Sequence, residues 1–385
     1  MRMGLHRHGG RADDRFRAYV EAVRPPFVKM LDPGEDGNVL AGWCKARGVE
    51  TIGRNFFGDG QHLSGGDLRS NINEVRNLAM RCPNIGYWEL HNEAWDQPGD
   101  MARYSDASLE FMAVMESLGR KAVIGCFAQG TPEVTGDNPS LEWSEYLPAV
   151  KHAIAHGHIL GLHEYSGPFM DFEVGWHCLR YRKALAILAS LGADVARLKV
   201  AITESGIDDV WGRPGPLGKG YKPFNGTEWS RPPASQHGDY AGQLLWYGNE
   251  LSRDRQIVGW VDFGWADESG DWGDFDLSTD PAMLQRVTIL QRQLPGASSG
   301  GPAMPTLNDA LFTEAAARQR IRLNPTAAIQ RAIMREGYVP TSDEFDVTHN
   351  GTGYVAQRAE RLDSGEVRVF YCAKGAWGDV RQAVK

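Results

Sequence analysis

Short apolar runs recur along the chain at intervals that predict buried β-strands. Each run has four to seven residues and is followed by a longer stretch that mixes apolar and polar positions. Runs of this kind are typical of strands that are covered on both faces, as in a parallel sheet. Strands are therefore expected over residues 3–6, 27–31, 51–55, 86–90, 122–126, 159–162, 198–203 and 257–263.

The stretches between these runs have the apolar spacing of helices. Helices are expected over residues 105–118, 179–191 and 240–253, with Asp239 placed to cap the last of them. Alternating strands and helices predict repeated βα units, and eight such units close into a (β/α)8 or TIM barrel. The competing architecture, an open doubly wound sheet, usually has a glycine-rich phosphate loop after its first strand. Residues 4–10, Gly-Leu-His-Arg-His-Gly-Gly, do not form that motif.

A change in composition predicts where the barrel ends. Residues 295–302 read Pro-Gly-Ala-Ser-Ser-Gly-Gly-Pro, a run of small and turn-forming residues that is typical of a linker. We therefore expect a barrel over residues 1–294, a linker over 295–306 and a small α+β module over 307–385. The module combines helical spacing with alternating runs such as Val367 to Tyr371. Binding to glycan, packing against the barrel and oligomerisation all stay open as its role.

Charge and composition exclude several classes of partner. The 385-residue chain has a formal net charge of -8 and no cluster of basic residues, which argues against a nucleic-acid partner. No apolar stretch has the roughly 18 residues of a membrane-spanning helix. The five cysteines are widely spaced and form no zinc or redox motif, so buried free thiols are expected. Residues 1–10 do not resemble a secretory signal, and a cytoplasmic location and secretion after processing both stay open.

Two glutamates are distinguished by their position at the ends of predicted strands. Asn-Glu and Thr-Glu each occur three times in the chain, so neither dipeptide is informative alone. Only Asn92-Glu93 follows an apolar strand, and only Thr203-Glu204 ends one. Barrel enzymes place their active sites at the carboxyl ends of the strands. Glu93 and Glu204 are therefore the candidate catalytic pair.

With these residues the chain resembles glycoside hydrolase clan A, in which an acid/base glutamate follows an asparagine on strand four and a nucleophilic glutamate ends strand seven. Further positions match by order and by strand: Arg54 on strand three, His163 and Tyr165 after strand six, and Trp265 after strand eight. The match covers residues 1–294 and is most similar to family 5 or family 39. It implies a retaining glycosidase that acts on β-linked oligo- or polysaccharides without a metal or organic cofactor.

The resemblance also implies a role for each catalytic residue. Glu204 is expected to be the nucleophile, with Arg54 and Tyr165 in contact with it and favouring its charged form. Glu93, beside that negative charge, is expected to hold a proton and to serve first as acid and then as base. A retaining mechanism requires the two carboxyl groups to lie about 5 to 5.5 Å apart.

Substrate contacts are expected from an amide, an imidazole and several indoles. Asn92 is expected to hydrogen-bond the sugar 2-hydroxyl, and His163 to orient its neighbours. Trp265 is expected to offer an apolar face to the sugar ring. Residues 205–238, rich in Gly, Pro and Trp, follow the seventh strand and are a candidate wall of the cleft. Loop tryptophans that are candidates for stacking on further sugar units are Trp95, Trp211 and Trp229.

Two alternatives from other classes stay open. The motif His6-Arg7-His8 at the end of the first strand is similar to the opening metal motif of amidohydrolase barrels, which implies a metalloenzyme. Strand five, however, ends without the histidine of that pattern, and only His163 with Asp262 or Asp267 could complete it. The second alternative is a non-catalytic carbohydrate-binding barrel, against which the two intact carboxylates argue.

Overall fold

A computed structural model describes most of the chain. The described residues are 1–8, 13–57, 68–93, 101–132, 140–172, 174–208, 220–224, 237–266, 270, 272–294, 328–336, 338–342, 344–349, 352–361, 366–376 and 379–384.

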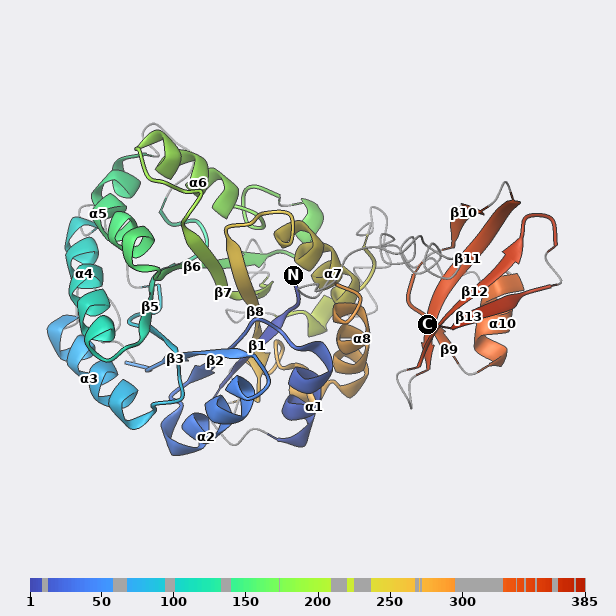
Figure 1. The fold of residues 1–385 in the computed structure, drawn as a ribbon, viewed down its shortest axis with the longest axis horizontal. Helices are drawn as coiled ribbons and strands as arrows, with labels where there is room; N and C mark the ends of the chain where they lie inside the picture. Colours follow the sequence, from blue (N-terminus) through green and yellow to red (C-terminus); the bar gives the residue numbers. More distant parts are fainter. Residues whose placement is uncertain are drawn as a thin grey trace.

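Parallel strands close into a barrel in the order β1 to β8, with β8 paired to β1 (Figure 1). Every strand that the sequence predicts overlaps an observed one, so the predicted (β/α)8 barrel is confirmed. Only β6 and β7 extend well beyond the predicted ends, each by four residues. The strands are β1 (Gly4–Arg7), β2 (Phe27–Leu31), β3 (Glu50–Arg54), β4 (Tyr87–Glu89), β5 (Lys121–Phe127), β6 (Ile159–Ser166), β7 (Lys199–Ile207) and β8 (Ile257–Trp265).

Helices surround the barrel on its outside (Figure 1). Aspartates begin several of them by accepting a backbone N–H in the first turn. Asp239 accepts from the N–H of Gly242 at 3.1 Å, which confirms the predicted cap, and Asp13 and Asp280 cap their helices in the same way. The helices are α1 (Asp14–Val23), α2 (Gly34–Lys45), α3 (Leu68–Arg81), α4 (Met101–Ser117), α5 (Ser140–His156), α6 (Tyr181–Ser190), α7 (Tyr240–Leu251) and α8 (Pro281–Gln291).

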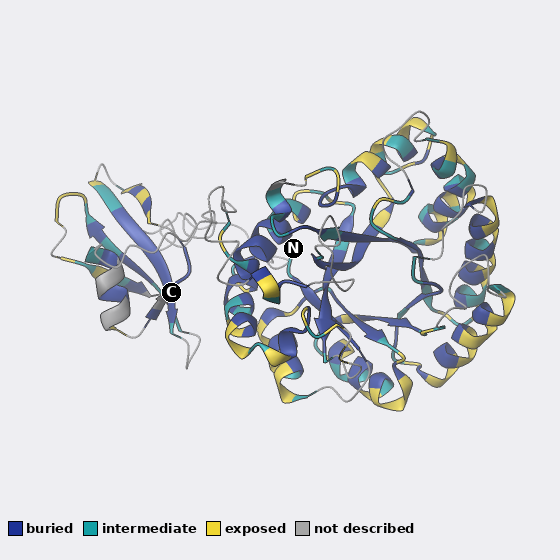
Figure 2. Ribbon diagram, turned by 180° about the vertical axis from the view of Figure 1, so that it is seen from behind, coloured by how far each residue is buried: buried dark blue, intermediate teal, exposed yellow. Residues whose placement is uncertain are grey.

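The main hydrophobic core lies between the barrel strands and the inward faces of these helices. Figure 2 shows buried residues along the strands and on the inner side of each helix, and exposed residues on the outer side. In α1, Phe16, Val20 and Val23 are fully buried at positions three or four residues apart, which is the spacing of one helix face. All five cysteines are buried free thiols, as predicted.

The interior of the barrel is filled in layers of different character. Its lower layer is apolar and consists of Phe27, Ile52, Val123, Cys126, Ile159, Ala201 and Val261. Side chains two residues further along a strand point in the same direction and form the next layer towards the carboxyl ends. Lys29 follows Phe27 in this way, and Glu89 follows Tyr87. Both are completely buried, so charged groups lie directly beneath the mouth of the barrel.

The C-terminal part forms a five-stranded antiparallel sheet with a helix on one face. Ile329 and Ile333 of the helix pack against Val355 and Phe370 of the sheet. The predicted α+β module is confirmed in its fold, whereas its boundary and the linker stay predictions because residues 295–327 lie outside the described ranges. The elements are α10 (Ala328–Arg335), β9 (Tyr338–Pro340), β10 (Phe345–His349), β11 (Thr352–Arg361), β12 (Val367–Ala373) and β13 (Arg381–Val384).

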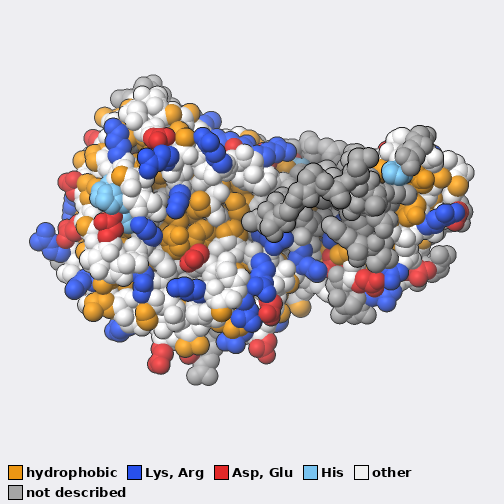
Figure 3. Space-filling model, viewed as in Figure 1, with side chains coloured by type: hydrophobic (Ala, Val, Ile, Leu, Met, Phe, Trp, Pro, Cys, Tyr) orange, Lys and Arg blue, Asp and Glu red, His pale blue; other side chains and the backbone are white. Residues whose placement is uncertain are grey.

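The surface carries charged side chains of both signs, as the composition of the chain leads one to expect (Figure 3). On the face of the barrel in Figure 3, basic and acidic side chains are interspersed. Within the described ranges, no helix combines the length and the apolar character that crossing a membrane requires.

Candidate active site

The barrel brings the two candidate carboxylates together at its carboxyl end. Glu204 lies on β7, and Glu93 lies in the loop after β4. A register shift between Leu162 and His163 in the β6–β7 pairing sets His163 opposite Glu204. Irregularities of this kind re-aim side chains at barrel rims. Glu93 itself has a φ of 51°, a left-handed conformation that is costly for a residue with a side chain and is typical of functional sites.

Glu204 is held by donors on both of its carboxylate oxygens. Oε1 accepts from Lys29 Nζ at 2.9 Å and from Arg54 Nη1 at 3.0 Å, and Oε2 accepts from the Tyr165 hydroxyl at 2.8 Å. The contacts expected from Arg54 and Tyr165 are thus present. Burial raises the pKa of Glu204, but Lys29, His163 and Arg54 outweigh it and hold the pKa well below its ordinary value. Glu204 is therefore a carboxylate at neutral pH.

Lys29 is a site residue that the sequence analysis did not identify. Its ammonium lies 2.7 Å from Glu89 Oε2 and 2.9 Å from Glu204 Oε1, and none of the three side chains is more than 5% exposed. With Arg54, these residues form a buried set of two cations and two anions. A buried charge is costly unless it is paired, so each member of the set depends on the others. The set fixes both the position and the charge of Glu204.

Glu93 lies close to Glu204 and lines the same pocket. Its Oε1 lies 2.7 Å from His163 Nδ1, which is itself 3.6 Å from Glu204 Oε2. One oxygen of Glu93 lies within 4.8 Å of one oxygen of Glu204. This separation is close to the roughly 5 to 5.5 Å of retaining glycosidases and below the roughly 6.5 to 9.5 Å of inverting ones.

The two carboxylates open into one pocket of about 340 Å³. This volume lies in the range of roughly 300 to 1,000 Å³ that is typical of small-molecule sites. The polar lining includes Asn92, whose amide oxygen accepts a hydrogen bond from Arg54. The Asn92 amide nitrogen is then the donor that this side chain offers to a ligand. The aromatic rings that line the pocket are those of His8, Phe56, Tyr165, Phe263, Trp272 and Phe275.

Trp265, which was predicted as a sugar platform, is not among the residues that line the pocket. Trp265 is fully buried and packs edge-on against Phe16 of α1 at a centroid distance of 5.5 Å, so its faces are not open to the pocket. The indole that lines the pocket is Trp272, which is 40% exposed and stands edge-on to Phe263. Three further tryptophans that were candidates for stacking lie outside the described residues, namely Trp95, Trp211 and Trp229.

In the described part of the chain, the histidines of the first strand do not assemble the metal motif of the amidohydrolase alternative. His6 lies beneath Glu204, with Nδ1 at 3.5 Å from its Oε1, and its ring contacts His8 at a centroid distance of 4.6 Å. Burial, together with Lys29 and His8, lowers the pKa of His6 well below its ordinary value. Asp262, a candidate fourth ligand, instead accepts a hydrogen bond from Tyr240 at the start of α7. Asp267 lies outside the described ranges.

Glu93, His163 and Glu204 are close enough together to hold a cation, and this possibility has to be weighed. Glu204 already accepts hydrogen bonds on both oxygens, and two of its three donors carry full positive charges. A metal ion would have to displace the Tyr165 hydroxyl and to bind within a few ångströms of Lys29 and Arg54. Coulomb repulsion between like charges at such distances is large in a buried site. The donor set therefore fits a proton-transfer site better than a metal site.

Comparison with known proteins gives similarity at the level of solved structures. No family model and no curated protein matches this chain. A calcium-binding mutant of Bacteroides uniformis β-glucuronidase 2 has a TM-score of 0.48 and 12% identity, over 99% of this chain and 45% of its own. This chain thus spans less than half the length of that protein.

Two further structures are of similar size to the barrel. A thermostable mutant of a Cellvibrio japonicus xylanase has a TM-score of 0.42 and 13% identity, over 68% of this chain and 86% of its own. A D-psicose 3-epimerase from Clostridium cellulolyticum H10, solved with D-tagatose, has a TM-score of 0.42 and 14% identity, over 75% of this chain and 96% of its own. Similarity at this level leaves the function to be argued from the residues of the site.

Proposed function

We propose that this protein is a retaining glycoside hydrolase that cleaves O-glycosidic bonds of an oligo- or polysaccharide by double displacement. The observation that carries the proposal is the pair Glu93 and Glu204, with oxygens within 4.8 Å of each other at the mouth of a barrel. The two groups differ in the way that this chemistry requires. Glu204 is buried and held ionised by cations, whereas the Glu93 side chain is 34% exposed to the pocket beside an imidazole.

In the first step, a glycoside binds with its anomeric carbon between the two carboxyl groups. Protonated Glu93 gives its proton to the leaving oxygen while Glu204 attacks the anomeric carbon. The carbon–oxygen bond to the leaving group breaks, and an ester bond to Glu204 forms. Lys29 and Arg54 hold Glu204 in place for this attack, so little reorganisation is needed.

In the second step, water hydrolyses the glycosyl ester with the help of Glu93. Glu93, now a carboxylate, takes a proton from a water molecule while the oxygen of that water attacks the anomeric carbon. The bond to Glu204 breaks, and Glu204 leaves as a carboxylate. His163 Nδ1 can donate to the ionised Glu93 or accept from the protonated one, so it can hold Glu93 in both states. Two inversions at the same carbon give net retention of configuration.

The proposal takes β-linked glycans as the first substrates to test, because the resemblance to clan A implies them. The pocket suits a neutral sugar ring, because its lining combines aromatic groups with polar ones that include the amide nitrogen of Asn92. No residue of the pocket requires a cofactor for either step.

Covalent trapping tests the nucleophile directly. A panel of 2,4-dinitrophenyl 2-deoxy-2-fluoro-β-glycosides is incubated with the full chain, and the labelled peptide is identified by mass spectrometry. We expect one sugar of the panel to add once, on Glu204, since an activated leaving group allows the first step and the fluorine slows the second. Labelling on another carboxylate would reassign the nucleophile, and proton NMR showing an inverted first product would exclude retention.

Substitution of each glutamate separates the two roles. Glu204→Ala should abolish turnover of every nitrophenyl β-glycoside, whereas Glu93→Ala should retain slow turnover of those with good leaving groups and be partly rescued by azide. The matched control is Glu74→Ala, because Glu74 also follows an asparagine but lies exposed on α3. Equal losses without azide rescue in both catalytic variants would contradict the assignment of roles.

The alternatives give different results in the same experiments. A carbohydrate-binding barrel without activity would bind glycans but show neither labelling nor turnover across the panel. A metalloenzyme that uses His6 and His8 would lose its activity in a chelator and regain it with a divalent metal.

A further inference from the structure

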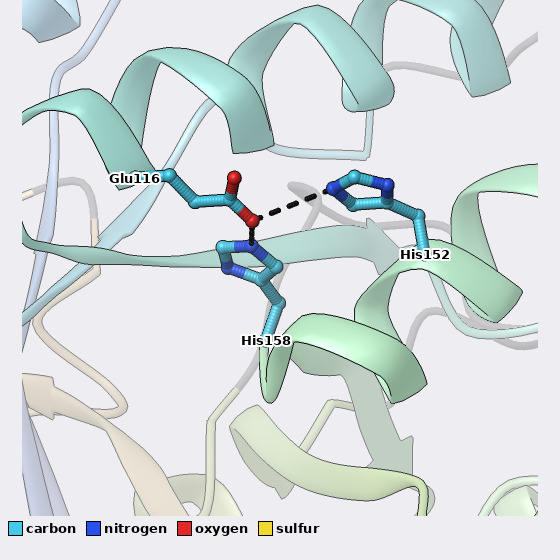
Figure 4. A group of neighbouring side chains, drawn as sticks. All are labelled: Glu116, His152 and His158. Atoms are coloured by element: carbon cyan, nitrogen blue, oxygen red, sulfur yellow. Dashed lines mark hydrogen bonds and ion pairs between the residues drawn. The ribbon is translucent and has the colours of Figure 1, made fainter.

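A second cluster of ionisable side chains lies on the outer helices of the barrel. Glu116 near the end of α4 is approached on one oxygen, Oε1, by three imidazoles from the end of α5 and the residues after it. His156 Nδ1 and His158 Nε2 lie 2.8 Å from this oxygen, and His152 Nε2 lies 3.4 Å from it. Figure 4 shows His152 and His158 pointing at the carboxylate from two sides.

His158 is fixed in one tautomer by the backbone. The N–H of Ala122 on β5 donates to His158 Nδ1 at 3.0 Å, so this nitrogen is an acceptor and carries no proton. A neutral imidazole has its proton on the other nitrogen, so Nε2–H donates to Glu116 at 2.8 Å. His158 is fully buried, and because its Nδ1 accepts a hydrogen bond the ring carries a single proton, on Nε2. It is therefore a donor that positions Glu116 and cannot also ligate a metal through Nε2.

His152 differs from His158 in having no hydrogen bond on the nitrogen that faces Glu116. Within the described part of the chain, His152 Nε2 is buried and has no hydrogen-bond partner. It lies one helical turn before His156 on the same face of α5, and the two rings are stacked at a centroid distance of 4.0 Å. Two imidazoles at this spacing, next to a carboxylate whose orientation is already fixed, provide the nitrogen and oxygen donors that zinc prefers.

We propose that Glu116, His152 and His156 bind a divalent transition-metal ion such as zinc, with His158 positioning the carboxylate. Zinc–nitrogen and zinc–oxygen bonds of about 2.0 to 2.1 Å at tetrahedral angles place neighbouring ligand atoms roughly 3.3 Å apart. The contacts of His152 and His156 to Glu116 Oε1 are 3.4 and 2.8 Å, so each nitrogen lies near the carboxylate oxygen at about the spacing that a shared ion requires. The two stacked rings still have to turn to bring their own nitrogens together.

The stacked rings of His152 and His156 have to move before both can bind one ion. An imidazole binds a metal in its own plane, so two nearly parallel rings have to tilt towards each other. The side chains of His152 and His156 are 28% and 45% exposed, which gives them room to turn and leaves the remaining coordination position to water. The ion would join α4 to α5 on the outside of the barrel, apart from the carboxylates of the proposed glycosidase. Lys121, whose ammonium is held at the carbonyl of His156, is a nearby positive charge that limits the affinity.

Zinc titration of the full-length chain tests this proposal. The metal-free protein is titrated at neutral pH against a chromophoric zinc chelator, and its melting temperature is measured with zinc and with EDTA. We expect one zinc per chain and a higher melting temperature with zinc. His152→Gln, His156→Gln and Glu116→Gln should each weaken binding by roughly tenfold or more and remove the increase in melting temperature.

The control variant is Glu93→Gln, because Glu93 lies with His163 and Glu204 in a separate group of side chains that is close enough to hold an ion. It should bind zinc as the unmodified chain does. His152 and His156 are only partly buried, and glutamine keeps an amide at each position, so folded variants are expected and are verified by circular dichroism. Absence of saturable zinc binding, unchanged binding in all three cluster variants, or loss of binding in Glu93→Gln would each overturn the proposal.

Discussion

Lys29→Met isolates the contribution of the buried charges beneath the proposed active site. Methionine has a similar length but no charge, so the substitution removes the ion pairs of Lys29 with Glu89 and Glu204 and leaves its packing largely in place. The buried set of two cations and two anions then has one uncompensated negative charge. Glu89 is the residue most affected, because its side chain is completely buried and Lys29 is the cation paired with it.

Two effects of different size are expected from this variant. Removing one partner of a buried ion pair costs roughly 3 to 5 kcal/mol, because the other charge stays buried without compensation. The free energy of unfolding should fall by about that amount. In addition, the pKa of Glu204 should rise, since Lys29 makes the largest charge contribution that lowers it. A nucleophile must be ionised, so the acid limb of kcat/KM should move to higher pH.

The double variant Lys29→Met/Glu89→Leu separates the two effects. It removes a cation and an anion together and leaves Arg54 paired with Glu204, so most of the lost stability should return. The acid limb should stay displaced, because Glu204 still lacks Lys29. Urea unfolding measures the first quantity, and the pH profile on a nitrophenyl glycoside measures the second. A double variant as unstable as Lys29→Met, or an acid limb that does not move in either variant, would refute this account of the site.

Two further predictions concern the pocket wall and a buried carboxyl group on β6. Trp272→Ala should lower kcat/KM about tenfold, or roughly 1.4 kcal/mol, through a higher KM. Trp176→Ala should leave kcat/KM unchanged, because this indole lies outside the pocket, although at 49% it is more exposed than Trp272 at 40%. Equal effects of the two substitutions would contradict a sugar contact. Glu164 is fully buried, and burial raises its pKa to about 7 from an ordinary value of 4.5. A raised carboxyl pKa favours the folded state most at low pH, so this group's contribution falls by about 3 kcal/mol as pH rises from 4.5 to 7. Glu164→Gln should flatten that part of the dependence in urea unfolding at a series of pH values, and an unchanged slope would contradict the shift.

The hydrophobic pattern was sufficient to predict the barrel but not the full length of the strands at its active side. Predicted β6 and β7 end where their apolar runs end, at residues 162 and 203, yet the strands continue to Ser166 and Ile207. The continuation contains His163 and Glu204, which are polar but buried, and Tyr165, which is partly buried. These side chains contact one another. Polar residues that satisfy each other inside a fold look like a strand end when only the sequence is considered.

Lys29 was detectable from the sequence, although its role was not. It interrupts the apolar strand Phe27–Leu31, and a lysine within a buried strand requires a buried partner. Which acid would be that partner depended on the barrel register, because Glu89 and Glu204 are 60 and 175 residues further along the chain. The prediction that Trp265 offers a face to the sugar ring lacked similar information. Whether an indole at a strand end faces the pocket or the helices depends on packing against Phe16, which strand order does not specify.

The arrangement around Glu204 also indicates which of its oxygens would attack in the proposed mechanism. Oε1 accepts from two cations and lies 3.5 Å from His6, so its lone pairs face the interior of the barrel. Oε2 has the neutral Tyr165 hydroxyl as its donor and lies on the side of His163 and therefore of Glu93. A neutral hydrogen bond withdraws less charge than two charge-assisted ones, so Oε2 keeps more of its nucleophilicity. The proposed glycosyl ester therefore forms at Oε2, while the cations on Oε1 stabilise Glu204 as the leaving carboxylate in the second step.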